Sequence, residues 1–128
     1  MKEPTIRAHK ANPKLPRYCW EIDENLPLDR FISYAVMRLR EGGIETFESC
    51  DGGRGHSSPE PMVRFWGNPG MGFRAFSVAT DYGLPASDIR RYWTVEDGEL
   101  VGPSWEMTFA RRRLVRLQLQ AERGGLIK

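Results

Sequence analysis

The stretch "IRRYWTVEDGELVGPSWEMTF", residues 89–109, gives the clearest indication of the fold. Its two ends, IRRYWTV and SWEMTF, are rich in aromatic and β-branched residues, while the middle, EDGELVGP, contains two glycines and a proline. Two such runs around a turn sequence are typical of a β-hairpin. Alternation along the strands predicts that two residues of the first, Trp93 and Val95, face three of the second, Trp105, Met107 and Phe109.

A helix is predicted immediately before this hairpin. Asn68 is a suitable N-cap, Pro69 suits the first turn, and Gly83 is a suitable end. Apolar residues recur between these points at helical spacing and form a stripe of Met71, Ala75, Val78, Ala79 and Tyr82.

The same order of elements occurs earlier in the chain. The runs "IETFESC" (44–50) and "PMVRFW" (61–66) predict two strands joined by a long connection. A helix is predicted before these strands, because apolar residues recur there at helical spacing. Asn25 is a suitable N-cap, Pro27 suits the first turn, and Gly42 and Gly43 end the helix. Helix, strand, strand is therefore predicted twice.

This order predicts a small α+β domain: an antiparallel sheet of about four strands, with two helices on one face. The run at 111–123 fits both helical and strand periods, and its Arg, Leu, Gln, Ala and Glu residues favour a C-terminal helix. The chain is accordingly divided into a basic N-terminal arm (1–17), the α+β domain (18–110) and a basic C-terminal helix or tail (111–128).

Charge is distributed unevenly along the 128 residues, whose net charge is +2. The arm at 1–17 has a net charge of +4 and the tail at 111–128 of +5, which leaves −7 for the middle. Basic ends can bind nucleic acid by releasing counterions. Apolar runs are too short for a membrane span or an export signal, and two cysteines make no disulfide framework, so we expect a cytoplasmic protein.

The loop "GNPGMGFR" (67–74) has the composition of an anion site. A helix N-terminus presents unpaired backbone N–H groups to a ligand, and glycines let the ligand approach closely. We therefore predict ligand contacts at Asn68, Gly70, Gly72 and Arg74, with Arg74 clamping a phosphate or carboxylate. The alternative interpretation is a tight turn from strand to helix.

Arg64 and Trp66 are a second candidate pair for ligand or partner contact. Arg64 alternates with Val63 and Phe65, which predicts that it lies on the face of the sheet opposite the core. Trp and Arg are the residue types that most often anchor partners. Alternatively, Trp66 covers one end of the core.

The loop "CDGGRGHSSPEP" (50–61) gathers metal-binding residue types. Cys50, Asp51, His56 and Glu60 offer the thiolate, imidazole and carboxylate groups that zinc accepts, although their spacing matches no common motif. Cys50 and His56 could instead form a nucleophile pair in a hydrolase. A third interpretation is an ordinary turn rich in glycine.

A pattern of glycines, prolines and a few other residues extends over residues 45–109. It consists of Glu48, Ser49, Cys50, Gly52, Gly53, Gly55, His56, Pro59, Glu60, Pro61, Val63, Arg64, Phe65, Gly67, Gly72, Phe73, Arg74, Gly83, Leu84, Pro85, Asp97, Gly98, Gly102, Pro103, Ser104, Trp105 and Glu106. This pattern resembles a family of short uncharacterised proteins of proteobacteria and their mobile elements. The resemblance implies a bacterial or prophage setting and no particular chemistry.

These features favour a non-enzymatic binding module that engages a protein partner or an anionic small ligand, a nucleotide included, at the start of the second helix. Two alternatives stand beside it: a metal- or cysteine-dependent hydrolase at the Cys50–His56 loop, and a protein that binds nucleic acid through its basic ends. No cofactor is expected. The open edges of a four-stranded sheet also favour a homodimer.

Overall fold

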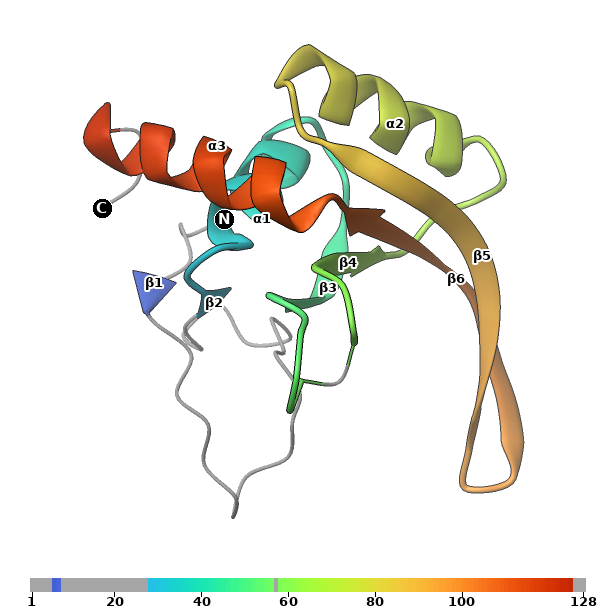
Figure 1. Cartoon of the computed structure of the whole chain (residues 1–128). Coiled ribbons are helices and arrows are strands. Elements are labelled where there is room, and N and C mark those ends of the chain that lie inside the picture. The colour runs from blue at the N-terminus through green and yellow to red at the C-terminus, as the bar shows by residue number, and fades with distance from the viewer. Residues whose placement is uncertain (1–5, 8–27, 57, 126–128) are drawn as a thin grey trace.

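The computed structural model describes residues 6–7, 28–56 and 58–125. Among these residues, three helices and six strands follow one another along the chain (Figure 1). In chain order they are β1 (Ile6–Arg7), β2 (Leu28–Asp29), α1 (Ser33–Glu41), β3 (Thr46–Cys50), β4 (Met62–Phe65), α2 (Met71–Asp81), β5 (Ala86–Glu96), β6 (Glu99–Phe109) and α3 (Arg111–Arg123).

The main sheet is four-stranded and antiparallel, with the strand order β3-β4-β6-β5. β1 and β2 form a separate parallel pair of two residues each. The predicted α+β class is confirmed, as is the order of two helix-strand-strand units followed by a C-terminal helix. In Figure 1 the β5–β6 hairpin extends well beyond the rest of the sheet.

The main core lies between the sheet and the three helices. In the sheet, Val63 of β4 pairs with Met107 of β6, and both side chains are fully buried. The helices contribute residues to the same cluster: Ala35, Val36 and Leu39 from α1, Ala75 and Ala79 from α2, and Leu114 and Ala121 from α3. Because α2 buries only small side chains here, its backbone can lie close to its neighbours.

A buried glutamine joins α3 to the start of α1. Gln118 Oε1 accepts a hydrogen bond from the backbone N–H of Tyr34 at 2.9 Å, and its Nε2 donates to Ser33 Oγ at 3.0 Å. The α1 N-cap, Ile32, supplies no side-chain bond of its own. A residue 84 positions away therefore satisfies a backbone donor that local sequence leaves open.

The first helix begins later than its sequence pattern predicts. Residues 28 and 29 are in strand β2, so the helix does not extend from Asn25 and Pro27, which themselves lie outside the described residues. The pairing of Leu28 with Ile6 requires extended backbone at this point. Apart from the two residues of β1, the predicted arm at 1–17 also lies outside the described part of the chain.

The β5–β6 hairpin is confirmed, but the predicted facing of its side chains is wrong. The chain turns at Asp97-Gly98, both with positive φ, and each strand runs for 11 residues. Trp105 consequently lies opposite Arg91, and Met107 lies opposite Ile89. Trp93 and Val95 instead lie toward the tip of the hairpin, where they are 56% and 70% exposed. The cause is the tight turn, which lengthens both strands and moves these two residues away from Trp105, Met107 and Phe109.

Candidate functional site

The residues predicted to bind an anion at the start of α2 contact other parts of the protein. Helix α2 begins at Met71 with Gly70 as its N-cap, two residues later than the predicted cap, and Asn68 O accepts a hydrogen bond from Met71 N at 2.9 Å. Arg74 Nη2 donates to Gly42 O at 3.0 Å, which ties α2 to the end of α1. One N–H donor of the guanidinium is therefore used in a contact between two helices.

Gly72 lies against an aromatic ring. A Cβ at this position would lie 2.7 Å from Trp105 Cη2, so the missing side chain makes room for that ring. Trp105 also donates from Nε1 to the carbonyl oxygens of Gly67 at 3.3 Å and Asn68 at 3.2 Å. The tight packing explains why glycine occupies position 72, independently of any ligand.

An apolar groove lies beside the same end of α2. Its volume is about 350 Å³, and the residues that line it come from α2, β5 and β6 and the turn before α2: Pro69, Gly72, Phe73, Phe76, Ile89 and Trp105. Phe73 is 85% exposed and Phe76 is 53% exposed. Phe73 and Phe76 are three residues apart on α2 and therefore neighbour each other on the helix surface.

Arg64 lies in a row of alternating charges across the sheet. The strand register places Glu48, Arg64, Glu106 and Arg90 side by side, in that order from β3 to β5. Arg64 Nη1 donates to Glu48 Oε1 at 2.6 Å, and its Nε donates to Glu106 Oε2 at 3.0 Å. We call these four residues the charge ladder; Arg64 is thus an internal member with an acidic partner on each side.

Trp66 lies near the end of this row of strands and packs on a second aromatic residue. Its ring stacks on Phe47, with centroids 4.1 Å apart, and the residue remains 41% exposed. This contact uses one face of the Trp66 ring, and the exposed remainder of the side chain is open to solvent.

The loop after β3 brings three metal-ligand types together. Cys50 Sγ lies 3.2 Å from His56 Nδ1, and the same nitrogen lies 3.8 Å from Asp29 Oδ2. The three donor atoms all lie within 4.8 Å of one another. The carboxylate in this group comes from Asp29 of strand β2. The prediction of Asp51 and Glu60 as the carboxylate ligands is wrong, because neither residue belongs to the group.

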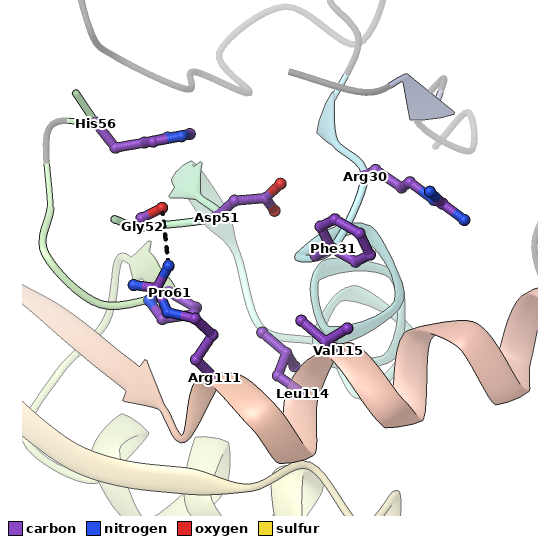
Figure 2. A pocket seen from close by; sticks show the side chains of 9 residues that line it. All are labelled: Arg30, Phe31, Asp51, Gly52, His56, Pro61, Arg111, Leu114 and Val115. Carbon is purple, nitrogen blue, oxygen red and sulfur yellow. Dashed lines mark hydrogen bonds between the residues drawn. The ribbon is translucent and has the colours of Figure 1, made fainter. Parts of the chain in front are cut away.

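Several hydrogen bonds fix the shape of the loop. Gly53 N donates to Ser58 O at 3.0 Å, and His56 N donates to Gly53 O at 3.1 Å. From α3, Arg111 donates to the carbonyl oxygens of Gly52 and Pro59, the first of which is drawn in Figure 2. The loop therefore has a defined fold that brings His56 back to Cys50.

A pocket of about 330 Å³ opens between this loop, the start of α1 and α3 (Figure 2). The residues that line it are Arg30, Phe31, Asp51, Gly52, His56, Pro61, Arg111, Leu114 and Val115. The two arginines are already engaged, because Arg30 forms an ion pair with Glu122 at 2.7 Å and Arg111 holds the loop.

Asp51 is the polar group of this pocket with the most perturbed environment. Burial, followed by the nearby charge of Asp29, raises its pKa to about 7. Its Oδ1 is buried without a hydrogen-bond partner, one of three such side-chain atoms among the described residues. Asp51 N donates to Asp29 Oδ2 at 3.0 Å, which helps to orient the Asp29 carboxylate toward His56.

The geometry gives little support to Cys50 as a catalytic nucleophile. Cys50 is fully buried, whereas reactive cysteines are partly exposed. In a catalytic triad the base uses one ring nitrogen for the nucleophile and the other for the orienting acid. Here Cys50 and Asp29 both approach Nδ1 of His56.

Comparisons with models of protein families, with curated proteins and with solved structures find no match to this chain. In the described part of the chain, no helix has both the length and the apolar character needed to cross a membrane.

Proposed function

We propose that this domain is a non-enzymatic binding module, in the bacterial or prophage setting that the sequence resemblance implies, and that it engages a protein partner beside the start of α2. The observation that supports the proposal most is the exposure of Phe73, at 85%, and of Phe76, at 53%, next to an apolar groove. Contiguous apolar surface of this kind is typical of protein interaction sites.

The shape of the surface favours a partner that inserts an apolar side chain. The groove is about 350 Å³ and is floored by the Trp105 ring, which Gly72 and the carbonyl of Gly67 hold in place. An aromatic floor with exposed phenylalanine side chains at its rim resembles the anchor pockets in which a few side chains supply most of the binding energy.

An anionic ligand has less support at this position. Arg74 donates to Gly42 O, and the charge of Arg64 is compensated by Glu48 and Glu106 in the charge ladder. Among the ligand classes that the sequence favours, we therefore give priority to the protein partner.

Replacing Phe73 by aspartate is expected to weaken binding of the partner at least about 30-fold in Kd, since hot-spot side chains contribute 2 kcal/mol or more. A photoreactive amino acid at position 73 would first capture the partner in cells, and the purified pair would then be titrated by calorimetry. Because Phe73 is 85% exposed, the melting temperature should change little.

Val95→Asp is a matched control, because Val95 is also apolar and is 70% exposed, but lies near the tip of the hairpin, outside the residues that line the groove. The variant should bind normally. Equal affinity of wild-type and Phe73→Asp proteins would contradict the proposal. If cross-linking and light scattering instead revealed only a second copy of the chain at position 73, the partner would be the domain itself.

Nucleic-acid binding remains a second candidate because α3 displays exposed arginines. Arg112, Arg116 and Arg123 are four and seven residues apart, so they share one face of the helix, and all three are exposed. This stripe belongs to the basic C-terminal segment that the sequence analysis singled out.

If the stripe binds nucleic acid, the affinity for a DNA duplex should fall steeply with salt, with a slope of log K against log salt of about −0.9 for each phosphate contact. Changing Arg112, Arg116 and Arg123 together to glutamine should remove about three such contacts. Fluorescence anisotropy over a range of salt concentrations measures the slope for the wild type and for the triple variant. Weak binding with no salt dependence would exclude this function.

A further inference from the structure

We propose that Asp29, Cys50 and His56 form a binding site for a divalent metal ion of tetrahedral preference, best matched by Zn²⁺, and that the ion holds the glycine-rich loop at 51–61 against strand β2. The site combines a carboxylate from strand β2, a thiol from the last residue of strand β3 and an imidazole from the loop that follows β3. It is independent of the surface proposed for a protein partner.

The distances between the donor atoms suit a tetrahedral ion. With bonds of about 2.3 Å to sulfur and about 2.0–2.2 Å to nitrogen and oxygen, adjacent ligand atoms of a tetrahedral zinc lie roughly 3.3–3.7 Å apart. The observed separations are 3.2 Å for Cys50 Sγ and His56 Nδ1, and 3.8 Å for His56 Nδ1 and Asp29 Oδ2. All three donor atoms lie within 4.8 Å of one another. Side-chain movements of about 1 Å at most would therefore bring them to tetrahedral distances around one ion.

Two of the donor atoms lie next to one nitrogen of the third ligand, His56. Sulfur and carboxylate approach the same nitrogen of His56, which a catalytic triad would not require and which a shared ion explains. Asp51 N donates to Asp29 Oδ2 at 3.0 Å, and Gly52 N donates to Cys50 Sγ at 3.4 Å. Hydrogen bonds of this kind orient the ligands of known metal sites.

Burial adds an energetic argument. Asp29 is 6% exposed and Cys50 is 0% exposed. The attraction between a divalent cation and a carboxylate or thiolate is much stronger in such a shielded, low-dielectric position than in water. A divalent cation would compensate both negative charges and would keep the thiol deprotonated.

Of the three ligands, His56 lines the pocket beside the loop, so solvent in this pocket lies next to the site. His56 and Asp51 both line that pocket, whose volume of about 330 Å³ admits solvent. Three protein ligands with a water molecule in the fourth position is a coordination that zinc commonly adopts.

The test uses the full chain, loaded with Zn²⁺ and freed of excess metal by gel filtration. Elemental analysis should give one zinc per chain for the wild type. Cys50→Ser and His56→Gln should each weaken zinc binding by more than about 100-fold, because loss of an outer-shell contact alone already costs roughly 10- to 100-fold in affinity. Glu60→Gln is the control, since this carboxylate of the same loop lies outside the group of three. It should bind one zinc normally.

A second measurement keeps the test valid if a ligand variant fails to fold. The chain has two cysteines, so Cys19→Ser leaves Cys50 as its one thiol. Loaded with Co²⁺, this variant should show a thiolate-to-cobalt charge-transfer band in the near ultraviolet. The metal should also slow tryptic cleavage after Arg54, the arginine of the loop. No stoichiometric metal in the wild type, or no thiolate band, would overturn the proposal.

Discussion

Gly52→Ala is expected to destabilise the domain by about 3 kcal/mol or more. A Cβ at this position would lie 2.2 Å from the carbonyl carbon of Glu60 and 2.4 Å from Pro61 N, closer than real Cβ atoms come to backbone atoms. The φ of +76° adds a further cost of about 1–2 kcal/mol for a residue with a side chain. Overpacking against rigid atoms contributes about 1–3 kcal/mol.

Gly83→Ala separates the two causes. Gly83 has nearly the same backbone angle, φ +68°, but an added Cβ would meet nothing within 4 Å. Its loss of stability in urea denaturation should therefore be confined to the backbone contribution of about 1–2 kcal/mol. Equal losses for the two variants would show that the loop at Gly52 moves aside easily, and that the close approach to Glu60 does not constrain it.

The elements of the fold could largely be predicted because their signals are local. The β5–β6 hairpin and helix α2 each depend on residues close together in sequence, and both elements form where they were expected. Their bounds differ: strand β6 already begins at Glu99, within the predicted connection, and α2 begins at Met71. The start of α1 could not be predicted in this way, because strand β2 depends on pairing with Ile6, more than 20 residues earlier. Non-local pairing overrides a local helical pattern.

The candidate metal site could be predicted only in part, for the same reason. Cys50 and His56 share one loop, and both were recognised from their residue types. Asp29 lies 21 positions before Cys50 in a segment that the pattern placed inside a helix, so no local signal linked it to the loop. The apolar groove was also missed, since Phe73 and Trp105 become neighbours only when β6 packs against α2.

The position of Arg64 opposite the core was predictable from alternation, whereas its partners were not. Glu48, Arg64, Glu106 and Arg90 lie on four strands, and only the register of the sheet brings them into one row. Isolated in sequence, Arg64 resembles an anchor for a ligand. Within the charge ladder it has a structural role that accounts for its charge.

Arg64→Met is therefore expected to lower the free energy of unfolding by about 3 kcal/mol, because it removes a cation from between two carboxylates. Glu48 has a side chain only 3% exposed, and breaking a buried ion pair from one side typically costs about 3–5 kcal/mol. We take the lower end because Arg64 itself is 28% exposed. The substitution also removes the guanidinium from the face of the Tyr92 ring, where Arg64 Cζ lies 5.0 Å from the ring centroid. Methionine retains part of the apolar stem of the arginine.

The same substitution at the outer end of the charge ladder is the control. Arg90 has a side chain 61% exposed, and its contact with Glu106 is long at 3.9 Å, so Arg90→Met should cost less than about 1 kcal/mol. Adding Glu48→Gln to Arg64→Met should restore part of the loss, because the buried charge is then removed together with its partner. Arg64→Met could instead lower the free energy of unfolding no more than Arg90→Met does, and still weaken binding to a partner. In that case Arg64 would act in recognition, and the charge ladder would contribute little to folding.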